Sequence, residues 1–353
     1  MHQELKSIVG LETQIRILLA GFGTMLLPLM KHLLKCPEKV TVAGVIPASN
    51  LKGYKALTEH PSQVEMLQLA EKHQIRILAA PGINSREFRN ELSELKPHIL
   101  LVGGWPEIIS SEIVTMKGLI SINCHGSLLP KYRGACPCVA TIFNGDQNVG
   151  LTFHLIDDGI DTGDILRQRE LVVENDETSL QLERRISEEF GKSVVPLLTD
   201  LKSGKVFPRK QSGIPSYVPK QQPEWGWIPW GADPKVIDQR IRALHGFIHI
   251  VTSLHGQVIA FESGRVIRTN CSAGSHTEES LIGPSTLAIT RNVNFPGEVL
   301  ANLPDKIMVA TRDPAVHVEL DKPEIVLDGT DVPHIRTGDR FLSIACSSIL
   351  KSA

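Results

Sequence analysis

Asn123 and His125 are two side chains whose types and spacing suit proton-transfer chemistry. They stand directly after the apolar run 119–122, which has the composition of a buried strand. Residues two apart on an extended backbone point to the same side, so both side chains can face one site. A carboxamide there can donate a hydrogen bond to an oxyanion, and an imidazole can carry a proton. The pair therefore predicts a catalytic site at the end of this strand.

The run SLLPKYRG directly after this pair is rich in turn-forming residues. We expect Leu128, Leu129 and Pro130 to form the wall of a pocket and Arg133 to be available for a substrate anion. These residues would place a substrate beside His125.

A second loop, IDDGIDTGD at 156–164, is rich in carboxylates and glycines. One of its carboxylates can hydrogen-bond His125 and bias the protonation of the imidazole. The loop lacks the regular ligand spacing and distal glutamate of a calcium-binding EF-hand. A histidine, an asparagine or an acidic loop alone is commonly structural, but their combination at one sheet edge favours an active site.

The first two hundred residues alternate short apolar runs with helical patterns, which predicts an α/β fold with a parallel sheet and right-handed crossovers. The expected strands are 15–20, 40–45, 75–78, 98–102 and 119–122, and the expected helices lie around 26–33, 62–73 and 85–95. The runs 150–155 and 165–173 alternate apolar and polar residues, which suits a half-exposed strand pair. A long amphipathic helix follows, capped near 176–178, with Gly204 past its end.

The composition changes after this helix. From Phe207 to Trp230 the chain holds five prolines and three tryptophans, which indicates an ordered linker. A helix at 234–246 and short strands at 257–262, 285–290, 298–303, 306–311 and 315–320 follow, a pattern that fits a small β-barrel of about five strands, as in an OB-like fold. We therefore expect a catalytic domain at 14–205, a linker at 206–228 and a C-terminal OB-like domain at 229–350.

The turn Gly21-Phe22-Gly23 follows a strand and precedes a helix, as in dinucleotide-binding folds. Leu26 stands where the third glycine of that motif belongs, and Pro47 follows the next strand in place of an acidic residue. The sequence therefore favours a tight turn over NAD binding. Because open α/β sheets bind ligands at the carboxyl ends of their strands, Gly21 and Gly23 remain candidate substrate-binding residues.

At these motifs the sequence closely resembles the 10-formyltetrahydrofolate-dependent formyltransferases. It carries the family pattern N-x-H-x-S-L-L-P-x-x-R-G-x-x-P from Asn123 to Pro137, followed by D-x-G-x-D-T-G-D-I from Asp157 to Ile165. The resemblance reaches 215–220 between the domains and 295–300 near the C-terminus. It implies a Rossmann-like catalytic domain, 10-formyltetrahydrofolate as co-substrate, and Asn123, His125 and Asp161 as the catalytic trio.

The resemblance also implies where the folate and the amine bind. The pterin would lie between the segment 102–110 and the acidic loop, with Trp105, Ile108 and Ile109 as walls, although Trp105 can equally be packing. The backbone of Asp157, Asp158, Gly159 and Ile160 would pair with the pterin edge. The expected substrate-binding residues are Gly21, Gly23, Ser127, Leu128, Leu129, Pro130 and Arg133.

The acceptor amine stays open between two partners. Methionyl-tRNA formyltransferases carry a basic loop after the second strand, whereas 47–61 here has few basic residues, and 244–256 lacks their N-P-W-P-G-A motif. The run 125–134 looks most like enzymes that formylate nucleotide-linked amino sugars. In contrast, 202–220 holds five basic residues (Lys202, Lys205, Arg209, Lys210 and Lys220) and no acidic one, which suits phosphate contacts with initiator methionyl-tRNA. We favour the small-molecule amine.

Other classes of protein are alternatives to a formyltransferase. A formyltetrahydrofolate hydrolase can use the same trio with water, a silent folate- or nucleic-acid-binding protein is an alternative, and a dehydrogenase is disfavoured by the incomplete glycine motif. The net charge of −2 gives no support to a globally basic nucleic-acid binder. No apolar run is long enough to span a bilayer and no export signal is recognisable, so we expect a cytoplasmic protein. The six cysteines are scattered without zinc-ribbon spacing, so we expect no metal.

Overall fold

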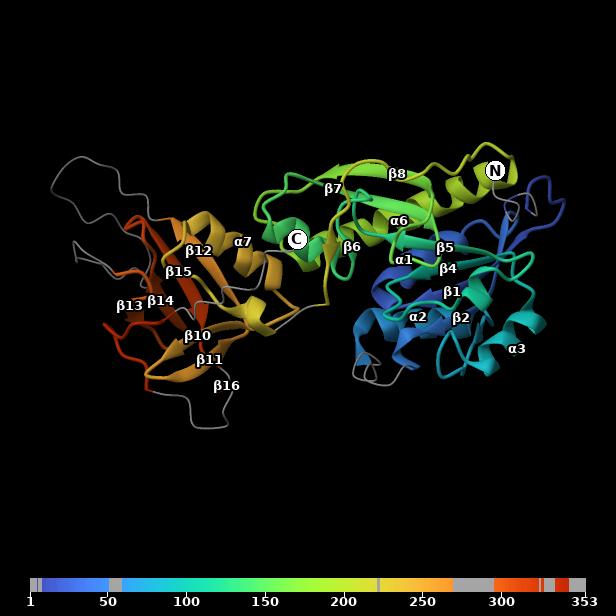
Figure 1. Ribbon diagram of the computed structural model, residues 1–353. Helices are drawn as coiled ribbons and strands as arrows, with labels where there is room; N and C mark the ends of the chain where they lie inside the picture. The colour runs from blue at the N-terminus through green and yellow to red at the C-terminus, as the bar shows by residue number, and fades with distance from the viewer. Residues whose placement is uncertain are drawn as a thin grey trace.

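A seven-stranded sheet forms the centre of the N-terminal part of the chain (Figure 1). The computed structural model describes residues 5, 8–50, 59–220, 223–268, 295–323, 325–326 and 334–342. The strands of the sheet are Ile15–Gly21 (β1), Val40–Pro47 (β2), Arg76–Ile77 (β3), Ile99–Gly103 (β4), Ile120–His125 (β5), Asn148–Leu155 (β7) and Ile165–Val172 (β8). They lie in the order β3-β2-β1-β4-β5-β7-β8, and the pairs from β3 to β5 are parallel. This arrangement confirms the predicted α/β fold with a parallel sheet.

Helices cover both faces of this sheet because its central strands are apolar on both faces. The helices are Gly23–Leu33 (α1), Pro61–Lys72 (α2), Arg86–Leu95 (α3), Ser111–Val114 (α4), Pro137–Phe143 (α5) and Ser179–Lys202 (α6). Within β1, Ile17 and Leu19 pack into one apolar cluster with α1 and α6. Leu18 packs into a second cluster with α3. The alternation follows the two-residue period of a strand.

The turn between β1 and α1 contains two glycines because two other segments pass close to it. A Cβ atom on Gly21, which has a φ of +147°, would lie 1.7 Å from the carbonyl oxygen of Gly103. A Cβ atom on Gly23 would lie 2.5 Å from the Cα atom of Gln63, whose Oε1 accepts a hydrogen bond from the Gly23 amide at 2.9 Å. Both glycines are therefore explained by backbone packing.

The strand pair β7 and β8 departs from its predicted exposure. Both strands run antiparallel to their neighbours, and β7 is buried along most of its length with only its first residue, Asn148, exposed, whereas β8 is exposed at several positions. The prediction of a half-exposed pair is therefore wrong for β7. The reason is coverage on both sides: Phe153 packs edge-on against Phe190 of α6 on one face, while Thr152 is buried on the other face, where its hydroxyl bonds the Ser127 carbonyl.

The C-terminal part of the chain, residues 223–342 (the C-terminal unit), contains two antiparallel sheets. One has the order β10-β11-β16 and the other β12-β15-β14-β13. Their strands are Ile250–Leu254 (β10), Gln257–Phe261 (β11), Gly264–Arg268 (β12), Val299–Asn302 (β13), Lys306–Ala310 (β14), Val316–Asp321 (β15) and Ile325–Val326 (β16). The predicted strand 285–290 lies outside the described residues. An OB-like barrel is not confirmed, and the sequence missed β10, β12 and β16.

Helix α7 (Pro234–Leu244) connects the C-terminal unit to the rest of the molecule. Its residues Ile237 and Ile241 belong to the apolar core of the C-terminal unit. Leu244, at its end, packs instead into the cluster that contains α1 and α6. The Ser179 hydroxyl at the start of α6 donates a hydrogen bond of 2.6 Å to the carbonyl of Ala243. One helix thus contributes to two cores.

The predicted linker packs on the N-terminal part of the chain. Strand β9 (Tyr217–Val218) pairs with β6 (Arg133–Gly134), and Arg209 forms a β-bridge with Ile165. The 3-10 helix η4 (Pro223–Gly226) follows. The boundaries 14–205, 206–228 and 229–350 stay a prediction.

The residues that the structure describes contain neither a membrane-spanning helix nor a metal-binding cluster of side chains. Within them, no helix combines the length and the apolar character needed to cross a bilayer. The same residues contain no group of three His, Cys, Asp or Glu side chains arranged to hold a metal ion.

We expect Gly21→Ala to lower the free energy of unfolding by at least about 2 kcal/mol, because the new methyl group overlaps the Gly103 carbonyl and the residue has an unfavourable φ. Urea denaturation measures this change. Gly126→Ala is the matched control, since its Cβ atom would lie at ordinary contact distances of 3.4 Å and more. A Gly21→Ala protein as stable as this control would contradict the packing explanation.

Candidate active site

The end of β5 presents Asn123 and His125 on the same side of the sheet. Ile122 and Cys124 alternate with them and point into the apolar cluster formed with α1 and α6. Because that cluster occupies one face, Asn123 and His125 must project from the other. His125 is buried, with 5% of its surface exposed. Burial of this kind makes any unpaired polar atom costly, so the hydrogen-bond partners of these side chains define the site.

The carboxylate of Asp161 lies between these two side chains. Its Oδ1 accepts a hydrogen bond of 3.0 Å from the Asn123 amide, and its Oδ2 accepts one of 2.8 Å from the Gly134 amide. The Oδ2 atom is also 3.5 Å from Nδ1 of His125. Asp161 has a φ of +53°, a conformation that non-glycine residues rarely adopt and that is concentrated at functional sites. The structure thus brings the three predicted residues together.

His154 is a fourth member of this network that the sequence analysis missed. It lies on β7 directly opposite Asn123 in the strand register. Its Nε2 is 3.1 Å from the Asn123 amide nitrogen and 3.3 Å from Oδ1 of Asp161. The signal that would have found it is the antiparallel pairing of the run 150–155 with the strand that carries Asn123. The sequence alone did not reveal this pairing.

The hydrogen bonds assign the tautomers of both imidazoles. Nε2 of His125 lies 2.7 Å from the carbonyl oxygen of Tyr132, so it carries a proton and donates it. Nδ1 of His154 lies 2.8 Å from the Leu155 carbonyl and likewise donates, which leaves its Nε2 as an acceptor. The Asn123 amide then donates one hydrogen to His154 and the other to Asp161. A neutral His125 faces Asp161 with the unprotonated Nδ1.

Burial and charge act in opposite directions on the titrating groups. Burial lowers the pKa of the His125 imidazole below its usual value, and the negative charge of Asp161 opposes part of that shift. Burial by itself would raise the pKa of Asp161, but the positive charge that the neighbouring imidazoles carry when protonated and the hydrogen bond from the Gly134 amide outweigh it and hold that pKa well below its usual range. At neutral pH the arrangement therefore contains an ionised carboxylate beside an imidazole that can accept a proton.

The run after β5 forms a compact loop whose polar groups bond within the protein. The Ser127 hydroxyl donates to the Lys131 carbonyl at 2.5 Å, and the Leu129 carbonyl accepts from the Gln168 amide at 3.0 Å. The Leu129–Pro130 peptide bond is cis. Leu128 fills the space beside Gly150, where a Cβ atom would come within 2.4 Å of its side chain. Leu129 is buried and Leu128 packs on β7, so the predicted apolar wall of a substrate pocket stays a prediction.

Arg133 is bound to the predicted linker. Its Nε and one terminal nitrogen donate to Oε1 of Gln211 at 3.1 and 2.7 Å, and its other terminal nitrogen donates to the Tyr217 hydroxyl at 2.8 Å. Gln211 in turn donates to the carbonyls of Asp161 and Gly163 at 2.7 and 2.9 Å. Arg133 therefore ties the linker to the acidic loop. Gln211 was also missed, because a single glutamine in a linker carries no recognisable pattern.

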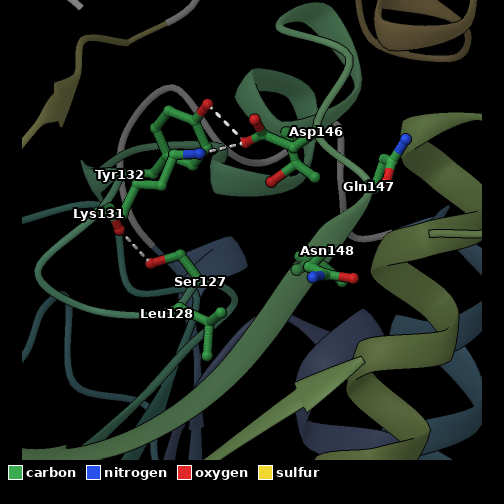
Figure 2. A pocket seen from close by; sticks show the side chains of 9 residues that line it. Ser127, Leu128, Lys131, Tyr132, Asp146, Gln147 and Asn148 are labelled. Atoms are coloured by element: carbon green, nitrogen blue, oxygen red, sulfur yellow. Dashed lines mark hydrogen bonds and ion pairs between the residues drawn. The ribbon is translucent and has the colours of Figure 1, made fainter. Parts of the chain in front are cut away.

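A cavity of about 260 Å³ lies between the loop after β5 and the start of β7 (Figure 2). Ser127 and Leu128 form one wall, and Asn148 contributes to the opposite wall. Tyr132 and Asp146 close one end, joined by a hydrogen bond of 2.7 Å from the phenol to the carboxylate. The cavity and the Asp161 network therefore share Tyr132, whose carbonyl accepts from His125.

Trp105, in the segment after β4, and Ile156, at the start of the acidic loop, both pack against the same apolar cluster. Ile109 is buried, whereas Ile108 and Ile160 expose 66% and 49% of their surfaces. Nε1 of Trp105 is buried and has no hydrogen-bond partner. Exposed apolar side chains and a buried donor without a partner are features that suit a flat ligand with a polar edge.

The acidic loop owes its shape to its own side chains. Asp157 accepts hydrogen bonds from the Gly159 amide and the Thr162 hydroxyl. A Cβ atom on Gly159 would lie 2.1 Å from that hydroxyl, so the close turn requires a glycine. Asp158 is exposed. The backbone from 157 to 160 lies at the surface next to Asp161, while the Asp157 carboxylate is used to hold the turn.

Comparison with known proteins identifies the family. The family model described as formyl transferase matches residues 13–198. The methionyl-tRNA formyltransferase of Caldanaerobacter subterraneus is 31% identical over 255 residues, which cover 72% of this chain and 81% of that protein. The methionyl-tRNA formyltransferase of Methylacidiphilum infernorum is 31% identical over 233 residues, which cover 65% of this chain and 72% of that protein.

Solved structures share the fold. An N-formyltransferase from Helicobacter canadensis, in complex with folinic acid and dTDP-3-aminofucose, has a TM-score of 0.57 at 20% identity, covering 88% of this chain and 100% of that one. HypX from Aquifex aeolicus, in complex with tetrahydrofolic acid, has a TM-score of 0.59 at 16% identity, covering 87% of this chain and 43% of that one. From the family match and the relatives at 31% identity, the chain belongs to the formyl transferase family, whose members transfer formyl groups from 10-formyltetrahydrofolate.

Proposed function

We propose that this enzyme transfers the formyl group of 10-formyltetrahydrofolate to the primary amine of a small molecule, such as a nucleotide-linked amino sugar, with Asn123, His125 and Asp161 as catalytic residues. The observation that carries the proposal is the placement of an ionised carboxylate beside a neutral imidazole and a carboxamide. Proton transfer and stabilisation of an oxyanion are the two requirements of formyl transfer to an amine.

His125 and Asp161 serve as the proton-accepting pair in this proposal. When the amine attacks the formyl carbon, it must lose a proton. A proton that reaches Nδ1 of His125 is stabilised by Oδ2 of Asp161, 3.5 Å away. Nε2 is already bonded to the Tyr132 carbonyl, so the protonated ring has a partner for each N–H group. A water molecule held by Asp161 would carry protons between the amine and the leaving N10 nitrogen.

Asn123 is the proposed donor to the oxyanion, but both of its amide hydrogens already have acceptors. One is directed at Nε2 of His154 and one at Asp161. Donation to an oxyanion therefore requires Asn123 to exchange one of these bonds for a bond to the substrate. A donor of this kind contributes roughly 3 kcal/mol to transition-state stabilisation. We assign the exchange to the His154 bond, because the bond to Asp161 fixes the charged group.

The folate would bind between the segment after β4 and the acidic loop. Trp105 offers a buried N–H group without a partner, and Ile108 and Ile160 offer exposed apolar surface. These features fit the pterin ring and its polar edge. Ile109 supports the segment from below, and the surface backbone from Asp157 to Ile160 would bind that edge.

Three basic side chains near the linker favour a small acceptor. Lys202 donates to the Thr13 carbonyl at 2.9 Å, Arg209 donates to the Gln168 side chain at 2.9 Å, and Lys210 pairs with Asp164 at 3.2 Å. These partners occupy hydrogen-bond donors that a tRNA phosphate would need, and the Asp164 carboxylate also offsets the charge of Lys210. This argues against a linker that follows a tRNA backbone.

Methionyl-tRNA is the second candidate acceptor. The supporting observation is the 31% identity to methionyl-tRNA formyltransferases over most of their length. The loop 47–61, where those enzymes carry a basic motif, lies partly outside the described residues. An activity assay with both amines therefore decides between them.

We expect Asn123→Ala, His125→Ala and Asp161→Ala each to abolish formyl transfer, because each removes a group that the reaction requires. Binding of a folate analogue should stay within about an order of magnitude of the unmodified enzyme, since none of these side chains forms the proposed pterin walls. Turnover and equilibrium binding measure the two effects. Turnover retained in one of the variants would remove that residue from the mechanism.

Asp161→Asn should move the titration of His125 to lower pH. The carboxylate raises the pKa of His125 against the effect of burial, so its neutral replacement leaves burial unopposed. NMR titration of labelled histidine rings measures the shift. His98, whose pKa is lowered by burial and by Arg16, serves as an internal control that should not move. An unchanged or higher pKa for His125 would contradict the assigned coupling.

Incubation with 10-formyltetrahydrofolate and a panel of amino-sugar nucleotides should release tetrahydrofolate, whereas initiator methionyl-tRNA should support little turnover. Each neutralised phosphate adds salt dependence, so efficient turnover on methionyl-tRNA that falls steeply with salt would reverse this assignment. Formate release without any amine would instead identify a formyltetrahydrofolate hydrolase.

A further inference from the structure

Tyr132 occupies an unusual position next to the proposed catalytic histidine. It has a φ of +57°, in the left-handed region, and 6% of its surface is exposed. Its carbonyl oxygen accepts the Nε2 hydrogen of His125 at 2.7 Å. This bond decides which ring nitrogen carries the proton and leaves Nδ1 facing Asp161. The position of one backbone carbonyl therefore sets the state of His125.

Three hydrogen bonds hold Tyr132 in this conformation. Its backbone amide donates to the Ser216 hydroxyl at 2.9 Å. Its phenol donates to Oδ2 of Asp146 at 2.7 Å (Figure 2), and it accepts from the Asn144 amide at 2.9 Å. Asp146 and Asn144 belong to the turn between α5 and β7, more than ten residues along the chain. The phenol thus attaches the loop after β5 to a separate turn.

The C-terminal unit packs against that turn. A Cβ atom on Gly145 would lie 1.9 Å from Nε2 of Gln239 in α7, so the two segments are in close contact. The guanidinium of Arg240, also in α7, lies 4.8 Å from the centre of the Phe143 ring. The turn that holds the phenol is therefore supported from both parts of the molecule.

We propose that Tyr132 is a positioning residue, whose phenol, anchored at Asp146 and Asn144, holds its carbonyl in the place where it fixes His125 as the Nε2–H tautomer. The proposal rests on the assigned function of His125 in formyl transfer. Tyr132 does not touch the reacting atoms; it acts through the backbone bond to His125. Without the two phenol hydrogen bonds, the Tyr132 backbone leaves the left-handed conformation more easily and its carbonyl moves away from His125.

Tyr132→Phe tests the proposal, because it keeps the ring and removes both phenol hydrogen bonds. We expect kcat to fall about 10- to 100-fold, while KM for 10-formyltetrahydrofolate changes less than about twofold. The ¹⁵N shifts of the His125 ring, recorded without substrates, should show a smaller population of the Nε2–H tautomer. Asp146→Ala should reproduce both effects, and Asp146→Asn, which keeps an acceptor for the phenol, should restore most of kcat.

Lys131→Met is the matched control. The Lys131 ammonium binds the same carboxylate oxygen of Asp146 at 2.6 Å but is half exposed, so its loss leaves the bond from the phenol in place. We expect kcat and the His125 spectrum to stay unchanged in this variant. A folded Tyr132→Phe protein with the wild-type tautomer and wild-type kcat would overturn the proposal. The His125 tautomer is measured without turnover, so this test does not depend on the proposed function. An active His125→Ala enzyme would contradict the proposed function but not the effect of Tyr132 on the tautomer.

Discussion

The buried carboxylate of Asp161 imposes a demand that several segments of this protein meet together. A charge removed from water is strongly unfavourable unless hydrogen bonds surround it. The Asn123 amide supplies one bond from β5, and the Gly134 amide supplies another from the loop after it. His125 and His154 approach from two neighbouring strands. The loop conformations, including the left-handed one of Asp161, follow from bringing these groups to one point.

The reversal of strand direction at β7 makes this convergence possible. In a purely parallel sheet, the loop after the strand next to β5 would lie beyond the end of β5. Here β7 returns along β5, so His154 faces Asn123 and the loop that follows folds back over the polar face. The linker then closes this face: Gln211 bonds the Asp161 carbonyl and Arg133. The proposed active site is thus assembled from β5, β7 and a segment outside the sheet.

The two parts of the molecule meet on the structural elements that support this site. Helix α7 contributes Ile237 to one core and Leu244 to the other, so the C-terminal unit cannot be displaced without disturbing the packing beside α6. Its contact with Gly145 reaches the turn that anchors the phenol of Tyr132. A C-terminal unit that served only to bind an acceptor would not require such contacts. Its packing gives it a structural role whichever amine is used.

The sequence by itself determined most strands and helices of the N-terminal part, the reaction family and the association of Asn123, His125 and Asp161, because apolar periodicity and contiguous motifs are local properties of the chain. It did not predict the burial of β7, the contribution of His154, or the engagement of Arg133 by Gln211. These depend on which segments meet in space, and a side chain's partner across a sheet or in a linker leaves no pattern in its own neighbourhood. Only the tertiary structure decided them, since the hydrogen bonds of a buried polar group are supplied by whatever residues the fold brings near it.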